Sequence, residues 1–152
     1  MGIMDPYAIK FYPDDIKKRI RLSDPVESIK KEMKKLSSKA DIFILLTHQG
    51  YDLDVEFAKK IDGLDLIVGS HSQTKIESPK EVNDALIVQA GKSGYYVGIV
   101  EIKTNRGKVV EKSGRIDTMK FDMPDDPRIM KMIEEYESKT GRMNMRKKKL
   151  KE

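Results

Sequence analysis

The chain of 152 residues contains no cysteine and only two histidines. Without cysteine, disulfides, thiolate metal sites and cysteine nucleophiles are all excluded, so any metal must be bound by His, Asp, Glu, Asn or Gln. No apolar run approaches the roughly 20 residues of a membrane-spanning helix. Residues 1–10 also lack a basic segment followed by a long apolar stretch. The sequence as given therefore predicts a cytoplasmic chain without a membrane-embedded segment.

The balance of residue types is that of a soluble folded protein. Apolar residues make up 38% and charged residues 36% of the chain, with both signs interleaved. The length predicts one domain, residues 1–140, followed by a basic tail, residues 141–152. Much of the net charge of +5 lies in that tail, which has no aromatic residues to stack on bases, so we do not expect nucleic-acid binding. The abundance of Lys and Glu is compatible with a heat-adapted source.

The first half of the chain shows the pattern of βαβ units. Asp24 and Pro25 form a helix start, and apolar residues then recur at helical spacing to about Ser38. Two continuous apolar runs, residues 41–46 and 64–68, predict strands that are buried on both faces. A helix from about Asp54 to Ile61 is expected between them.

The second half predicts consecutive strands and a last helix. Strands are expected over residues 85–90, 95–103 and 108–119, as an antiparallel meander with a hairpin turn at residues 105–107. A terminal helix is expected over residues 127–139. At the other end, Gly2-Ile3-Met4 resembles the last residues of a strand. The order of elements predicts the α/β class.

His48 and His71 each follow one of the apolar strands. In an open α/β sheet, ligands bind beyond the carboxyl ends of the strands, so adjacent strands bring both imidazoles to one edge. Taken singly, each histidine is an ordinary polar residue; as a pair in equivalent positions, they favour a metal site for Zn, Mn or Fe. If the segment is extended, Gln73 projects to the same side as His71 and adds an amide oxygen. A two-metal catalytic site would still need carboxylates.

A resemblance to a known family is carried by four segments: residues 40–50, 63–74, 87–91 and 96–98. Their order and spacing are similar to the later part of 5′-nucleotidase catalytic domains, which belong to the calcineurin-like metallophosphoesterases, and the resemblance spans roughly residues 2–139. It implies half of a four-layer αββα sandwich, with His48 and His71 bound to one divalent metal ion (Zn, Mn or similar) and Gln73 bound to the other. It also implies hydrolysis of nucleotide phosphate esters by a metal-activated water.

The sequence departs from this family in what it does not contain. The Asp-x-His, bridging Asp and Asn-His motifs of the family would lie before Met1, and no Asp-x-His, Gly-Asp or Asn-His pair occurs in the chain. We therefore expect a fragment that is inactive alone, with no catalytic residue of its own and with its substrate-binding residues unassigned. Full-length relatives usually act outside the cytoplasm.

The missing half of the sandwich also predicts association. The inner face of the sheet would be an exposed apolar surface, covered by a separate amino-terminal half or by a second copy of the chain. A completed site would take a nucleotide or another phosphate ester. The alternative is a non-catalytic oligomeric remnant that at most binds a metal weakly. Asp52 and Asp54, near His48, either orient the metal-binding histidines through hydrogen bonds or cap the helix.

Overall fold

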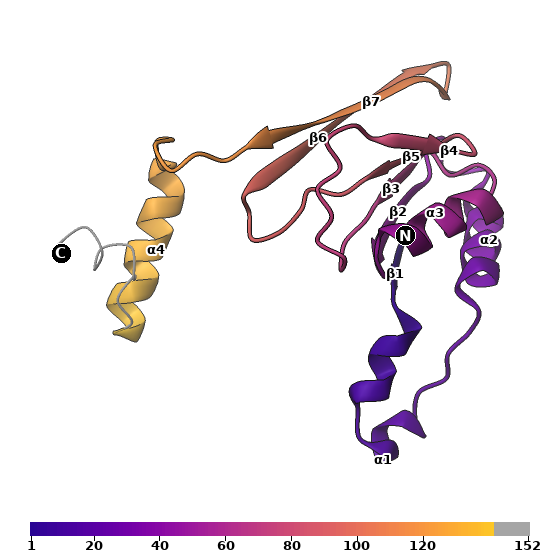
Figure 1. Cartoon of the computed structure of the whole chain (residues 1–152), viewed down its shortest axis with the longest axis horizontal. Helices are drawn as coiled ribbons and strands as arrows, with labels where there is room; N and C mark the ends of the chain where they lie inside the picture. The colour runs from indigo at the N-terminus through magenta and orange to yellow at the C-terminus, as the bar shows by residue number, and fades with distance from the viewer. Residues whose placement is uncertain (142–152) are drawn as a thin grey trace. The chain divides into compact units, whose positions relative to one another are not determined.

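The computed structural model describes residues 1–141, so the expected basic tail, apart from Gly141, lies outside the described residues. The chain forms two compact units, Met1–Met119 and a second one that starts at Lys120. The first unit contains a five-stranded sheet in the order β1-β2-β3-β5-β4 (Figure 1). β1, β2, β3 and β5 are parallel, and β4 is antiparallel to β5. The strands are β1 (Gly2–Met4), β2 (Ile44–His48), β3 (Leu66–Val68), β4 (Lys80–Val82) and β5 (Ala85–Val88).

Two helices cover one face of this sheet. α2 (Pro25–Leu36) begins where the sequence predicts, because the Asp24 side chain accepts a hydrogen bond from the Glu27 amide at 2.9 Å. α3 (Tyr51–Lys60) begins three residues before the expected start. Apolar side chains from both helices pack on three strands and form the core: Ile29, Leu45, Phe57, Ala58, Ile61, Leu64, Ile67, Ala85 and Ile87.

The other face of the sheet is partly open. Side chains along β2 alternate between exposed and buried, so the prediction that this strand is buried on both faces was wrong. Leu45 is fully buried against the helices, while Leu46 is 55% exposed on the opposite face, beside exposed Ile44, Met4 and Val68. A strand's own sequence does not reveal whether its second face has a cover, and here the described elements leave Leu46 and Met4 more than half exposed.

A long hairpin follows the sheet. β6 (Tyr96–Asn105) and β7 (Lys108–Thr118) pair antiparallel, and the hairpin turn lies where the sequence predicts it. Arg106 and Gly107 have positive φ in this turn, whereas the expected residues were Asn105 and Gly107. The predicted meander is only partly present, since the strand at residues 85–88 joins the parallel sheet and pairs with β4, which the sequence did not reveal. A cavity of about 270 Å³ lies between the hairpin and the open face near Val68, Val88 and Ile116.

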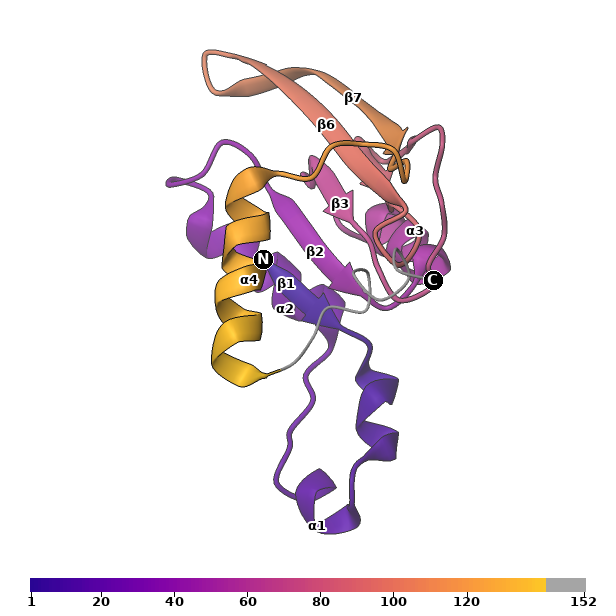
Figure 2. The same ribbon diagram turned by 90° about the vertical axis from the view of Figure 1, so that its left-hand side faces the viewer.

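Short helical turns occupy the connection after β1. Gly2–Met4 forms a strand, as its sequence suggested; it lies at the edge of the sheet and pairs with β2 so that Met4 lies opposite His48. A 3₁₀ helix, η1 (Pro6–Phe11), and a short α-helix, α1 (Asp14–Lys17), then lead toward α2. Figure 2 shows β1, β2 and β3 side by side, with the connection that contains α1 below them.

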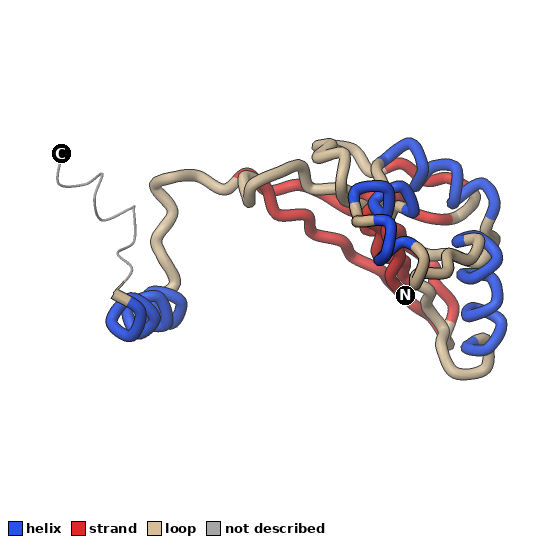
Figure 3. Tube along the Cα trace, turned by 90° about the horizontal axis from the view of Figure 1, so that it is seen from below, coloured by secondary structure: helices blue, strands red, loops and turns tan. Residues whose placement is uncertain are grey.

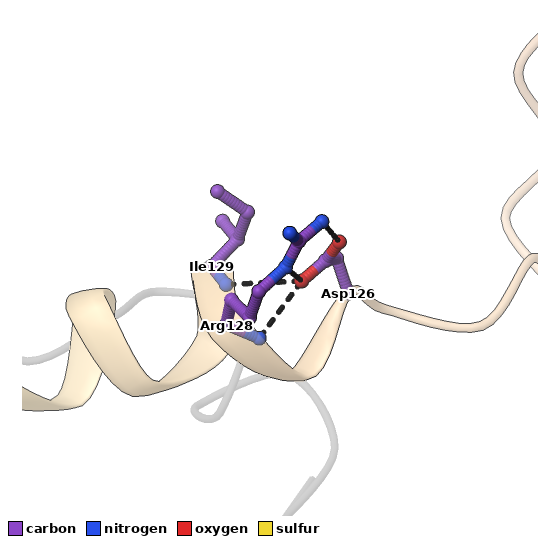
Figure 4. A network of polar contacts seen from close by, with 3 residues as sticks. All are labelled: Asp126, Arg128 and Ile129. Atoms are coloured by element: carbon purple, nitrogen blue, oxygen red, sulfur yellow. Dashed lines mark hydrogen bonds and ion pairs between the residues drawn. The ribbon is translucent and has the colours of Figure 1, made fainter.

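The second unit contains α4 (Pro127–Thr140), close to the predicted bounds, and is reached through a loop drawn in tan in Figure 3. Asp126 caps this helix by accepting hydrogen bonds from the amides of Arg128 and Ile129, and it pairs with the Arg128 guanidinium at 3.0 Å (Figure 4). The guanidinium holds the pKa of the Asp126 carboxyl below its usual value. Within residues 1–141, no helix has the length and apolar character needed to cross a membrane.

Candidate metal centre

His48 is the last residue of β2, and parallel pairing on both sides fixes its position. Its carbonyl accepts a hydrogen bond from the Asp5 amide at 2.9 Å, just beyond the end of β1. On its other side β2 pairs with β3, with Leu46 opposite Val68, so the chain after β3 emerges beside His48. His48 thus lies at the carboxyl edge of the sheet, on the same face as Ile44 and Leu46, as strand alternation requires.

The loop after β3 brings His71 to the same place. Its Nδ1 lies 3.3 Å from Nε2 of His48, and the ring centroids are 5.0 Å apart at an interplanar angle of 75°. Both side chains are exposed to solvent. The structure therefore brings together the two histidines that the sequence placed at one sheet edge.

Hydrogen bonds join the two histidine loops directly. The Gly50 amide donates to the Ser70 carbonyl at 3.0 Å, and the Tyr51 amide donates to Oγ of Ser72 at 3.1 Å. Gly50 has a φ of 99°, a backbone conformation that residues other than glycine rarely adopt. The turn at Gly50 thus lets α3 start at once and lets its first amides reach the second loop.

Ser72 also connects the loop to the end of β5. Its hydroxyl donates to Oε1 of Gln89 at 3.1 Å and is 2.9 Å from Oγ1 of Thr74. Gln89 is buried and directly follows β5. The loop that follows β3 is therefore held by hydrogen bonds to residues that follow its two neighbouring strands, β2 and β5.

Gln73 lies in a different backbone setting from the one expected. The segment is a bend in which His71 has a φ of 80° and Gln73 a φ of 56°. The alternation of an extended segment therefore does not apply here, and that geometric reason for grouping His71 with Gln73 was wrong. The side chain of Gln73 is exposed, two residues beyond His71. Its assignment as a metal ligand now depends only on the family resemblance.

A buried carboxyl lies behind the two loops. Asp54 is 0% exposed, and its Oδ1 accepts a hydrogen bond from Nε2 of Gln49 at 3.1 Å. The Thr47 hydroxyl lies near the Asp54 carboxyl and lowers its pKa. Within the described residues, however, the Thr47 hydroxyl and Oδ2 of Asp54 each lack a hydrogen bond of ordinary geometry. Burial outweighs these neighbours and raises the pKa of Asp54 above its usual value.

The sequence contained a signal for this burial. Asp54, Phe57, Ala58 and Ile61 follow the spacing i, i+3, i+4, i+7, which places the aspartate on the buried face of the helix. Neither Asp52 nor Asp54 caps α3: the N-cap residue is Gly50, and no side chain caps that end. The capping alternative for these two residues was therefore wrong.

Asp54 should make stability depend on pH in the direction opposite to most carboxyls. Because its pKa is higher in the folded than in the unfolded chain, its contribution is fully present below the unfolded value near 4 and is lost as pH rises through the folded-state pKa. We expect Asp54→Asn to gain in unfolding free energy relative to the unmodified chain as pH rises from 4 to 7, measured by urea unfolding. Asp52→Asn, at an exposed position, is the control. Parallel curves for Asp54→Asn and the unmodified chain would contradict the prediction.

The histidine pair fits part of a divalent metal site. Two nitrogens bound at about 2.1 Å to one tetrahedral zinc ion are separated by about 3.4 Å, and the observed nitrogens are 3.3 Å apart. The same distance also suits a hydrogen bond between two imidazoles. No group of three or more His, Cys, Asp or Glu side chains suited to a metal occurs within residues 1–141. The described chain thus offers a pair of nitrogen ligands and no adjoining carboxylate.

Comparison with known proteins gives consistent relatives. No model of a known protein family matches the chain. The uncharacterized metallophosphoesterase YunD of Bacillus subtilis is 36% identical over 102 residues, which cover 67% of this chain and 21% of YunD. Human 5′-nucleotidase is 28% identical over 136 residues, covering 76% of this chain and 24% of the relative. The chain therefore spans about a quarter of the length of these relatives.

A solved structure agrees with them in fold. The crystal structure of a 5′-nucleotidase precursor from Thermus thermophilus matches with a TM-score of 0.65 and 25% identity, over 76% of this chain and 27% of that one. The parallel sheet, the hairpin and the α/β class are thus those of metallophosphoesterases, as the resemblance implied. By sequence and by fold, the chain belongs to the 5′-nucleotidase family of metallophosphoesterases and corresponds to part of its members' length.

Proposed function

We propose that the chain carries part of the two-metal centre of a 5′-nucleotidase-like phosphoesterase and becomes active when other polypeptide segments supply the carboxylate ligands. The observation that carries this proposal is the approach of His48 and His71 to 3.3 Å at the carboxyl edge of the sheet. Ligand sites in open α/β sheets lie at this edge. The substrates are nucleotide phosphate esters, a choice supported by the relatives named 5′-nucleotidase.

His48 and His71 would hold one divalent ion, and Gln73 the other. When bound, the metal ions supply a nucleophilic water and stabilise negative charge on the phosphoryl group. The chain's own contribution is to present two imidazole nitrogens at a fixed separation, from loops joined by the Gly50 and Tyr51 amides. The solvent exposure of both rings leaves room for further ligands and for substrate.

The open face of the sheet is where the completing polypeptide would bind. Ile44, Leu46, Met4 and Val68 expose apolar side chains on this face, beside His48. Covering apolar area contributes about 25 cal/mol per Å². A segment packed here would gain binding energy from these residues and would bring its own side chains next to the histidines. Either an amino-terminal half of the domain or a second copy of the chain could occupy the face.

The test is reconstitution. The chain is mixed with a polypeptide that carries Asp-x-His and Asn-His motifs of this family, complex formation is followed by light scattering, and phosphate release from AMP is assayed with Mn²⁺ or Zn²⁺. We expect turnover that His48→Ala abolishes and that Ser70→Ala, in the same loop system, preserves. A well-folded complex without turnover would end the catalytic proposal and leave the non-catalytic oligomeric remnant as the better description.

A further inference from the structure

Asp54 is a buried carboxyl for which the proposed metal chemistry has no use. Asp52, the other acidic residue in the first turn of α3, is exposed, whereas Asp54 is completely buried. Within the described residues, Asp54 forms no ion pair, and one of its oxygens has no hydrogen-bond partner. Burying a carboxyl in this way costs free energy. Stability alone therefore does not account for an aspartate at this position.

One oxygen of this carboxyl holds the first histidine loop. Oδ1 of Asp54 accepts the hydrogen bond from Nε2 of Gln49 at 3.1 Å, and Gln49 is itself buried. Gln49 directly follows His48 in sequence. The amide side chain is thus fixed inside the protein, and the backbone next to His48 is fixed with it.

The other oxygen lies against the second histidine loop. A Cβ atom added to Gly69 would be 2.3 Å from Oδ2 of Asp54, well inside any allowed contact. The backbone of Gly69 is not in the left-handed region, so glycine is required here for space and not for conformation. The Gly69 amide donates to the Val88 carbonyl at 2.8 Å, which fixes this residue to β5. The carboxyl thus fills the space between Gln49 and Gly69.

We propose that Asp54 is a positioning residue that sets the separation of the two histidine loops and so the distance between the imidazoles of His48 and His71. It touches neither imidazole and is not a catalytic residue. Its effect on metal binding rests on the proposed function, but its effect on loop geometry does not. The hydrogen bond from the Gly50 amide to the Ser70 carbonyl joins the two loops directly, and the Asp54 carboxyl lies between Gln49 and Gly69 in the core.

The first test compares Zn²⁺ affinities of Asp54 variants by calorimetric titration with Zn²⁺ alone. Asp54→Ala removes both contacts, and we expect its affinity to fall about 10- to 100-fold, the range found when groups that orient metal ligands are removed. Asp54→Asn keeps the shape and the oxygen that accepts from Gln49, so it should restore most of the affinity. Asp52→Ala is the matched control and should bind like the unmodified chain. Equal affinities for the Asp54→Ala and unmodified chains would count against the proposal.

A second measurement is independent of metal. Nuclear Overhauser contacts between the ring protons of His48 and His71 in the metal-free chain should weaken in Asp54→Ala and persist in Asp54→Asn. Gly69→Ala presses on the carboxyl from the other side and should weaken the same contacts, so it decides the matter if Asp54→Ala does not fold. If the unmodified chain binds no Zn²⁺, the proposed function fails while the ring contacts still test the role of Asp54. Unchanged contacts in a folded Asp54→Ala or Gly69→Ala chain would overturn that role.

Discussion

Replacing either His48 or His71 by alanine should lower the affinity of the chain for Zn²⁺ about 100-fold. Four-ligand zinc sites contribute about 10–16 kcal/mol, or about 3 kcal/mol for each ligand, which corresponds to about two orders of magnitude in the dissociation constant. The nitrogens of these two side chains are 3.3 Å apart and come from two loops that hydrogen bonds hold together. Little reorganisation is therefore needed for both to bind one ion.

The double variant distinguishes a shared ion from two separate weak sites. If both imidazoles bind the same ion, one substitution already removes chelation, and the second adds much less than the first. Ser70→Ala provides the control, because Ser70 is an exposed residue next to His71. Calorimetry with Zn²⁺ and with Mn²⁺ gives the constants. Two small, additive losses would mean that the 3.3 Å contact is only a hydrogen bond between imidazoles.

Local signals in the sequence identified much of the fold. The aspartate and proline at residues 24 and 25 mark a helix start through hydrogen bonding and a fixed φ, and α2 begins there. Asn105 and Gly107 indicated the hairpin turn because their residue types tolerate positive φ; the turn lies there, although Arg106 and not Asn105 adopts the positive φ beside Gly107. The positions of the histidines followed from strand order, since parallel neighbours end at the same edge. Each of these features depends on a few adjacent residues or on chain order alone.

Features that depend on contacts between distant segments could not be predicted from such local signals. Strand β4 is only three residues long and is stabilised by pairing with β5, so its sequence carries little signal of its own. The bend at residues 71–73 is held by contacts of Ser72 with Tyr51 and Gln89, both far away in sequence. The exposed face of β2 was missed because an apolar run indicates what a strand prefers to contact, not what is present to cover it.

Two isoleucines on neighbouring strands should lose very different amounts of stability on truncation to alanine. Ile67 in β3 is fully buried on the helix-covered face, whereas Ile44 in β2 is 39% exposed on the open face. Ile67→Ala removes core contacts and leaves a cavity, and we expect it to lower the unfolding free energy by about 2–5 kcal/mol. Ile44→Ala should cost the isolated chain less than about 1 kcal/mol. Urea unfolding of both variants measures the two values.

The comparison becomes most informative in the presence of a partner. If a second polypeptide or a second copy covers the open face, Ile44 becomes buried there, and Ile44→Ala should weaken association while Ile67→Ala acts mainly on the fold of the chain itself. Light scattering or sedimentation at several concentrations gives the association constants. A large loss of stability for Ile44→Ala in the monomeric chain would show that this face is already covered within the chain. Equal association constants for Ile44→Ala and the unmodified chain would mean that the partner does not bury Ile44, and would contradict the proposal that it binds the open face beside His48.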